Sequence, residues 1–235
     1  MTRRLLLPIL TALALSLAAC GDDEETTGER AAGETTATAA TETSPAEPAS
    51  GCREVEVPKP KKVKVSKPTA KEQLDPKKKW VAVVNTSCGT VEITLDVKNN
   101  PKTASSFAHL TNERFYDGLA FHRIVPGFVV QGGDPEGSGQ GGPGYSVVEA
   151  PPQGQKYTRG VVAMAKTEIE KPGTSGSQFF IVTAPDAGLP AAYAVAGKVT
   201  KGDDVVELLA NIPNDPADNR PTEPVIIENA EVVSR

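Results

Sequence analysis

The chain has 235 residues, 38% of them hydrophobic, and a formal net charge of −5. This length allows one domain of ordinary size plus an additional segment, and the mild acidity gives no indication of a nucleic-acid partner. With two His and three Cys, the composition argues against both a His-based metal site and a disulfide-rich scaffold. The 21 Gly and 20 Pro favour strands and turns over a helical bundle.

The first 19 residues have the features of an export signal. Arg3 and Arg4 precede an apolar run, which is too short for an ordinary membrane-spanning helix, and small residues follow it. The ending Leu17-Ala18-Ala19-Cys20 resembles the lipobox of bacterial lipoproteins. The resemblance implies cleavage before Cys20 and acylation of that residue, which would anchor the protein outside the bacterial cell membrane. The alternative is an ordinary signal peptide with a chance Cys.

Residues 20–77 are expected to connect the anchor to the folded domain. Residues 21–50 are rich in Thr, Ala, Glu, Gly and Pro and contain no aromatic residue, which predicts a disordered tether. From residue 53 to residue 79 the segment becomes rich in Lys, Pro and Val. This basic part is either a patch for anionic lipid headgroups or cell-wall polymers, or a solvated polyproline-like spacer.

Two further cysteines, Cys52 and Cys88, remain after export. In an oxidising compartment this even pair indicates a disulfide between the linker and the turn of the first hairpin. Two unpaired thiols are the alternative.

The folded domain is expected to span residues 78–235. Residues 80–84 and 91–95 have the pattern of two strands around a turn, and Asn100 with Pro101 is expected to cap and begin a helix. Further strands are expected at residues 161–166, 176–182 and 193–199. Asp203 is expected to cap a short helix, and residues 225–227 are expected to close the sheet.

Residues 121–134 predict a β-hairpin, because two apolar runs flank a Pro-Gly pair. The hairpin contains one guanidinium, at Arg123, and one carboxamide, at Gln131. A two-residue turn would direct these two side chains to opposite faces. A three-residue loop that includes Phe128 pairs Arg123 directly with Gln131, and we favour it because such loops with a Gly are a common hairpin class.

A second carboxamide lies beside an aromatic residue in the strand expected at residues 176–182. Side chains alternate along a strand, so Gln178 and Phe180 share one face. The Gly-rich run at residues 135–144 is interpreted as a surface loop that folds back against the hairpin. It does not predict a phosphate site, since neither a Lys-Ser/Thr pair nor a helix follows it.

The hairpin at residues 121–134, together with Gly176-Ser177-Gln178-Phe179-Phe180, resembles the cyclophilin-type peptidyl-prolyl isomerases. The resemblance covers roughly residues 78–233. It implies a mainly β fold, with a closed eight-stranded antiparallel β-barrel capped by two α-helices. It also implies cis–trans isomerisation of the peptide bond before proline, without a cofactor, and proline-containing peptides and proteins as partners. We expect a monomer without a metal.

The resemblance assigns roles to individual residues. Arg123 corresponds to the catalytic arginine and Gln131 to the glutamine that orients it. Substrate-binding roles fall on Phe128, Val129, Ala165, Gln178, Phe180, Leu189 and Tyr193, with Phe128 as the floor of the proline pocket.

Three departures from the family pattern are visible in the sequence. Lys166 stands where many members have a groove Asn, and residues 167–174 form a longer and more charged segment than in compact members. Gly188 stands where drug-sensitive members have Trp, so tight cyclosporin binding is not expected.

The residue types suit this reaction. Rotation about an X–Pro bond disrupts amide resonance, and the prolyl nitrogen regains a lone pair in the twisted transition state. A cationic donor aimed at that nitrogen binds the transition state more tightly than either isomer. Arg123, which is always charged, is expected to act in this way on exported proteins. The alternative is a proline-binding chaperone or scaffold module with incidental turnover.

Overall fold

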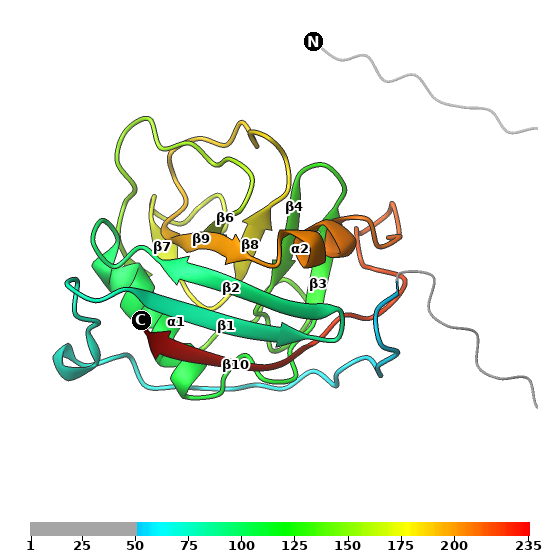
Figure 1. The fold of residues 1–235 in the computed structure, drawn as a ribbon, viewed down its shortest axis with the longest axis horizontal. Coiled ribbons are helices and arrows are strands. Elements are labelled where there is room, and N and C mark those ends of the chain that lie inside the picture. Colours follow the sequence, from blue (N-terminus) through cyan, green and yellow to red (C-terminus); the bar gives the residue numbers. More distant parts are fainter. Residues whose placement is uncertain (1–50) are drawn as a thin grey trace, which may run out of the picture. The chain divides into compact units, whose positions relative to one another are not determined.

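Within residues 51–235, which the computed structural model describes, eight antiparallel strands form the main sheet (Figure 1). Their order across the sheet is β10-β1-β2-β9-β6-β8-β4-β3. The bounds are β1 Trp80–Thr86, β2 Gly89–Leu95, β3 Phe121–Val125, β4 Val129–Gly132, β6 Val161–Met164, β8 Phe179–Val182, β9 Val195–Lys201 and β10 Ile227–Ser234. A small second sheet pairs β5 (Val147–Val148) with β7 (Thr174–Ser175).

The expected export signal at residues 1–19, the predicted lipidation of Cys20 and the predicted tether up to residue 50 fall outside the described residues. No helix of the described residues is long and apolar enough to cross a membrane.

The curled sheet is joined at its edges by irregular segments. Among the described residues no continuous ladder links β3 with β10. Instead, Ala120 and Ile226 form an isolated bridge, and the Phe121 amide donates to the Val225 carbonyl over 2.9 Å. The expected eight-stranded antiparallel architecture is confirmed, whereas its closure depends on these few contacts.

The last strand begins later in the chain than the expected strand at residues 225–227. Only the last residue of the expected strand belongs to β10, which pairs with β1 along its length, from Trp80 opposite Ser234 to Thr86 opposite Ile227. Residues 228–231 contain two Glu and an Asn, so their sequence lacks the apolar alternation that predicts a strand. Pairing with β1 decides their conformation.

The described chain contains two α-helices, α1 (Pro101–Asn112) and α2 (Asp203–Ala210), and one 3₁₀ turn, η1 (Ala70–Glu72). Helix α1 contacts β9 and β10, and helix α2 contacts β2, β3 and β4, so that they cover different ends of the sheet (Figure 1). Both helices were expected from the sequence.

The expected N-cap of α1 is confirmed in position but makes no side-chain capping bond, and the N-cap of α2 lies one residue earlier than expected. Asn100 occupies the N-cap of α1, but its side chain donates to Asp96 over 2.8 Å. The carboxylate of Glu149 instead accepts from the first backbone N–H groups of α1, those of Lys102 and Thr103, at 3.1 and 2.8 Å. A negative group at this position also interacts favourably with the helix dipole.

The N-cap of α2 is Gly202, whereas Asp203 is already helical. The Gly202 backbone has φ +85°, and a Cβ atom there would overlap the carbonyl oxygen of Thr90. Close approach to β2 therefore requires glycine and decides where α2 begins.

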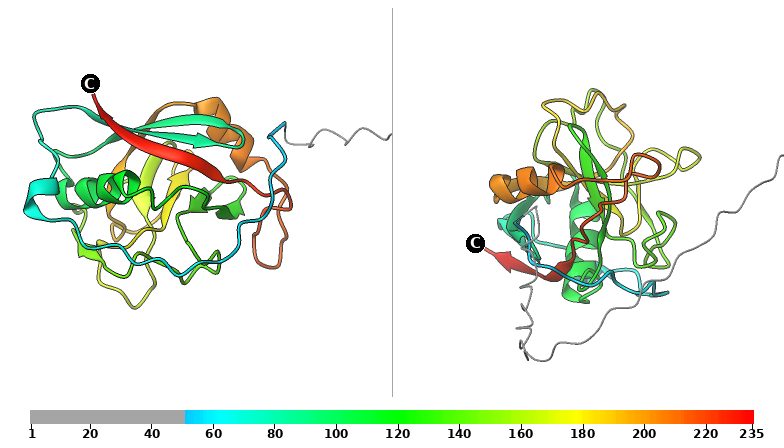
Figure 2. Two further views of the ribbon diagram at one scale, coloured as in Figure 1. Left: turned by 90° about the horizontal axis from the view of Figure 1, so that it is seen from below. Right: turned by 90° about the vertical axis from the view of Figure 1, so that its right-hand side faces the viewer.

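Residues 51–77 form a strap along the outside of the sheet (Figures 1 and 2, blue to teal). The Lys61 amide donates to the Pro135 carbonyl and the Val65 amide to the Pro143 carbonyl, both over 2.9 Å. The side chains of Val63, Val65 and Leu74 pack against the main hydrophobic core. The strap therefore belongs to the folded unit, and the domain boundary expected at residue 78 is too late in the chain.

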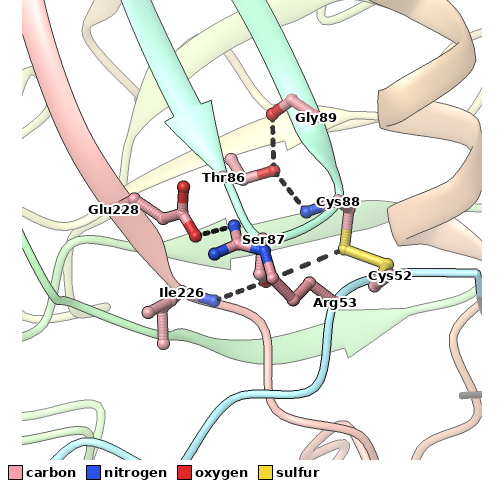
Figure 3. Close-up of a disulfide and its surroundings, with 8 residues drawn as sticks. All are labelled: Cys52, Arg53, Thr86, Ser87, Cys88, Gly89, Ile226 and Glu228. Atoms are coloured by element: carbon pink, nitrogen blue, oxygen red, sulfur yellow. Dashed lines mark hydrogen bonds and ion pairs between the residues drawn. A yellow bond between two sulfur atoms is a disulfide. The ribbon is translucent and has the colours of Figure 1, made fainter.

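Strap and sheet are also joined covalently, because Cys52 and Cys88 form a disulfide (Figure 3). Beside it, the Arg53 amide donates to the Ser87 carbonyl over 2.8 Å, and the Arg53 guanidinium pairs with Glu228 of β10. These contacts hold the start of the strap against the β1–β2 turn and the first residues of β10.

The disulfide is expected to stabilise the domain, because it restricts the unfolded chain across a sequence separation of 36 residues. Replacing both cysteines with serine should lower the free energy of unfolding by about 3–4 kcal/mol, the loop-closure value for a loop of this length. Urea unfolding of both proteins measures this difference. A reductant should destabilise only the wild type, and coincident unfolding curves for the two proteins would contradict the prediction.

Candidate active site

The hairpin of β3 and β4 has the predicted three-residue loop. Val125 pairs with Val129 and Arg123 with Gln131. The amide of Phe128 donates to the carbonyl of Val125 over 3.0 Å, and Gly127 has φ +67°. Glycine adopts this left-handed conformation without strain, which allows the loop to close in three residues.

A β-bulge at His122 directs Arg123 toward the site. Phe121 pairs with Gly132 and Arg123 with Gln131, so that His122 is the extra residue of β3. In a regular strand the side chains two residues apart point to the same side. With the bulge between them, Phe121 enters the main core whereas Arg123 lines a pocket. The sequence pattern did not indicate this bulge.

A chain of hydrogen bonds orients the guanidinium of Arg123. Its Nη1 donates to Oε1 of Gln131 over 3.3 Å, and Nε2 of Gln131 donates to Oε1 of Gln178 over 3.0 Å. Nε2 of Gln178 in turn donates to the carbonyl of Gly141 over 2.9 Å. Within residues 51–235 no carboxylate forms an ion pair with Arg123. The positive charge is therefore held in place without being neutralised.

The pocket beside Arg123 has a volume of about 220 Å³, and most of its lining residues are apolar or aromatic. All of the predicted catalytic and substrate-binding residues except Gln178 line this pocket, and Lys166 lines it as well. The lining residues are Arg123, Phe128, Val129, Gln131, Ala165, Lys166, Phe180, Leu189 and Tyr193.

The aromatic wall of the pocket is supported from behind by Tyr157. The rings of Phe180 and Tyr193 meet edge to face, with 5.5 Å between their centroids. The fully buried Tyr157 donates its hydroxyl to the Tyr193 carbonyl over 2.7 Å and accepts from the Tyr193 amide over 3.0 Å. Sequence reasoning missed Tyr157, because it lies 36 residues before its partner and outside any motif.

A larger groove of about 500 Å³ adjoins the pocket and shares Gln131, Ala165 and Lys166 with it. The Gly-rich loop, residues 139–146 in particular, forms much of its wall, together with Gln178. A Cβ atom on Gly141 would overlap the carboxylate of Asp134, so glycine is required where the loop approaches the hairpin. The loop expected at the surface therefore shapes the site directly.

Comparison with known proteins identifies this arrangement. The family model described as "Cyclophilin type peptidyl-prolyl cis-trans isomerase/CLD" matches residues 81–232. The chain belongs to the cyclophilin-type peptidyl-prolyl cis–trans isomerases. The family and the isomerase activity expected from the sequence are thereby confirmed.

Similar cyclophilins occur in bacteria and eukaryotes. Peptidyl-prolyl cis-trans isomerase B of Streptomyces anulatus is 38% identical over 175 residues, which cover 66% of this chain and 97% of the relative. The protein of the same name from Bacillus subtilis is 43% identical over 121 residues, which cover 52% and 83%.

A solved structure with the same fold is the crystal structure of a Cryptosporidium parvum cyclophilin type peptidyl-prolyl cis-trans isomerase. It superposes with a TM-score of 0.62 at 31% identity, covering 67% of this chain and 99% of that one. A second structure of the Cryptosporidium protein, determined in the presence of the dipeptide Ala-Pro, has a TM-score of 0.61 and the same identity.

Lys166, one of the departures from the cyclophilin pattern, lies at the junction of the pocket and the groove. Its Nζ donates to the carbonyls of Thr167 and Glu170 at 2.8 and 3.2 Å and lies 5.6 Å from the centroid of the Tyr193 ring. The ammonium group thus holds the segment after β6 in a closed turn at the rim of the site.

His122, the bulge residue, is only 8% exposed, and within the described chain neither ring nitrogen has a hydrogen-bond partner. Burial lowers the pKa of His122 below its usual value, an effect that Asp134 opposes and that Arg220 and Arg123 reinforce. The ring therefore stays neutral at pH 7. It lines a different cavity from that of Arg123, so it has no direct contact with the proposed chemistry.

The lowered pKa of His122 predicts a loss of stability in mild acid. The unfolded chain binds a proton near pH 6.5 whereas the folded chain resists it, so protons favour unfolding as the pH falls from 7 to 5. One such group contributes a slope of up to about 1.4 kcal/mol per pH unit. The His122→Asn variant should reduce this slope in urea unfolding measured across that pH range. An unchanged slope would show that His122 does not titrate in this way.

Proposed function

We propose that this cyclophilin isomerises X–Pro bonds by directing the guanidinium of Arg123 at the prolyl nitrogen. The observation that carries the proposal is a positive charge facing a small apolar pocket and oriented by the neutral acceptor Gln131. A carboxylate in place of Gln131 would offset the charge that the reaction requires. The carboxamide orients the guanidinium and leaves its charge available.

The chemistry needs no nucleophile or general base. The barrier to rotation, about 18–20 kcal/mol, arises from amide resonance, and the twisted amide carries a nitrogen lone pair that the planar amide lacks. Arg123 donates to that lone pair in the transition state only, which is the condition for acceleration rather than tighter ground-state binding. A rate enhancement of about 10⁵ requires roughly 7 kcal/mol of such differential binding.

The apolar wall supplies the fixed point about which the peptide turns. We infer that the proline ring packs between Phe128, Val129 and Phe180, and that Leu189 and Tyr193 complete the enclosure. With the ring held, rotation is confined to the bond on its amino side, and the reacting nitrogen stays within reach of Arg123.

The adjoining groove is the proposed site for the residues that precede proline. It meets the proline pocket at Ala165 and Gln131, where the peptide backbone would pass from one to the other. The Ala-Pro dipeptide named for the Cryptosporidium structure supports proline-containing peptides as the ligand class of that relative. We extend this ligand class to the present chain.

The N-terminal sequence supports exported proteins as the clients. The expected export signal and the resemblance of the ending at Cys20 to a lipobox support a location outside the cell membrane on a lipid anchor. The disulfide between Cys52 and Cys88 suits such an oxidising compartment.

Replacing Arg123 with alanine tests the mechanism. We expect kcat/KM for a proline-containing peptide to fall on the order of 100-fold or more, because a positioned transition-state donor is lost. A protease-coupled isomerisation assay measures this rate, and circular dichroism checks the fold. Arg159→Ala is the matched control, since Arg159 pairs with Glu207 and does not line the pocket.

Equal rates for Arg123→Ala and Arg159→Ala would contradict the assigned role of Arg123. Peptide binding by the wild type without measurable isomerisation would favour the alternative of a proline-binding chaperone module.

Lipidation is tested by metabolic labelling with a fatty acid in bacterial cells that express the full chain. The wild type should incorporate label, whereas the Cys20→Ser variant should not. Absence of label on the wild type, or label that persists in Cys20→Ser, would show that Cys20 is not the acylated residue. Isomerase activity of the purified domain should be the same for both proteins, because the anchor contributes nothing to the pocket.

A further inference from the structure

The strap carries a row of exposed lysines, of which Lys59 and Lys61 also border the cavity that His122 lines. Between residues 57 and 71 the sequence contains no acidic residue, although the whole chain has a net charge of −5. The side chains that form the row are all exposed and are those of Lys59, Lys61, Lys62, Lys64, Lys67 and Lys71.

The middle of the strap is extended, whereas Lys71 lies in the 3₁₀ turn η1. Val63 and Val65 pack against the core and the adjacent Lys62 and Lys64 are exposed, which is the alternation of an extended chain over residues 62–65. Backbone hydrogen bonds from residues 61 and 65 to the Gly-rich region fix the middle of the strap. The two views of Figure 2 show the strap following the outer surface of the domain. The charges are therefore ordered before any partner binds.

The lysines of the row lack protein counterions. None of them takes part in an ion pair with a residue of the described chain. Lys61 donates only to the backbone carbonyl of Asp117, at 3.3 Å. Six exposed positive charges that form no ion pair within the described residues create a local positive field on an acidic protein, and an anionic surface is complementary to such a row.

We propose that the lysine row docks the domain onto the anionic headgroups of a lipid bilayer. The charge, exposure and rigidity of the row carry this inference, and the choice of a bilayer rests on the proposed anchor at Cys20. Only 31 residues separate Cys20 from Cys52 of the strap in the sequence, so the anchor keeps the row close to the headgroups. The lipid anchor would not hold a soluble polyanion near the row in this way, which favours the bilayer as the partner.

Docking through the strap would leave the proline pocket accessible. The segment between β8 and β9 supplies Leu189 and Tyr193 to the pocket. In Figure 1 and in the right-hand view of Figure 2, this segment lies on the opposite side of the domain from the strap. With the lysine row on the membrane, the isomerase site would face outward, toward exported chains.

The contribution of the row is large enough to measure without the lipid anchor. A lysine close to an anionic leaflet contributes roughly a five-fold gain in partitioning at physiological salt. Removing three such charges should therefore weaken binding roughly 100-fold. Because surface charges are screened, the effect should diminish as salt is raised.

The test uses the chain from Gly21 onward, which lacks both the export signal and Cys20. It retains all of the described residues, 51–235. Its binding to vesicles of phosphatidylglycerol and phosphatidylcholine is measured by co-sedimentation, with pure phosphatidylcholine vesicles for comparison. We expect salt-sensitive binding to the anionic vesicles only. The triple variant Lys62→Gln, Lys67→Gln, Lys71→Gln should lose this binding and retain full isomerase activity, because none of these three lysines lines the pocket or the groove.

A charge-matched control separates the row from net charge. The triple variant Lys156→Gln, Lys171→Gln, Lys198→Gln removes three exposed lysines that lie outside the strap and outside the pocket. It should bind like the wild type. Equal losses in the two variants, equal binding to neutral vesicles, or retention by an anionic cell-wall polymer without vesicle binding would overturn the proposal. The assay contains no acylated protein, so its result is independent of the Cys20 labelling and of the Arg123 mechanism.

Discussion

The site depends on the register between β3 and β4. Two local features set that register, the three-residue loop at Gly127 and the bulge at His122. Because side chains alternate along a strand, a change of one residue in either feature would turn Arg123 away from the pocket or Phe121 away from the core. The hairpin thus satisfies packing and charge placement together. The bulge residue is His122, whose buried imidazole has no hydrogen-bond partner within residues 51–235.

Around this hairpin the fold holds one positive charge at the edge of an apolar pocket. Gln131 accepts from Arg123, Gln178 continues the chain, and the carbonyl of Gly141 ends it. All three acceptors are neutral, so orientation is achieved without neutralising the guanidinium. Preorganised charge of this kind stabilises a transition state without reorganisation during the reaction, which suits a reaction that only rotates a bond.

The strap changes the interpretation of the N-terminal region. Its composition, dominated by lysine and proline, left open a patch for anionic surfaces or a solvated spacer, and the few valines did not suggest a packed element. In the structure these valines pack against the core, and the backbone beside them is hydrogen-bonded to the Gly-rich region. An extended chain on this surface can bury alternate side chains. The disulfide at Cys52 secures one end, while the Nε2 of His109 contacts the carbonyl of Ser66 at 2.9 Å farther along.

The sequence by itself determined the features that arise within a few neighbouring residues. These include the hairpin and its loop length, the start of α1 at Pro101, the alternation of Phe179 and Phe180, and the motif residues that identify the family. Tertiary structure decided the features whose partners lie far apart in the chain. Glu149 reaches the N-terminus of α1, Tyr157 holds Tyr193, β10 forms against β1, and Gly202 is required by the proximity of β2. The reason is physical: turn geometry and side-chain alternation act between adjacent residues, whereas a cap, a closing strand or a packed strap needs a surface that exists only after the chain has folded.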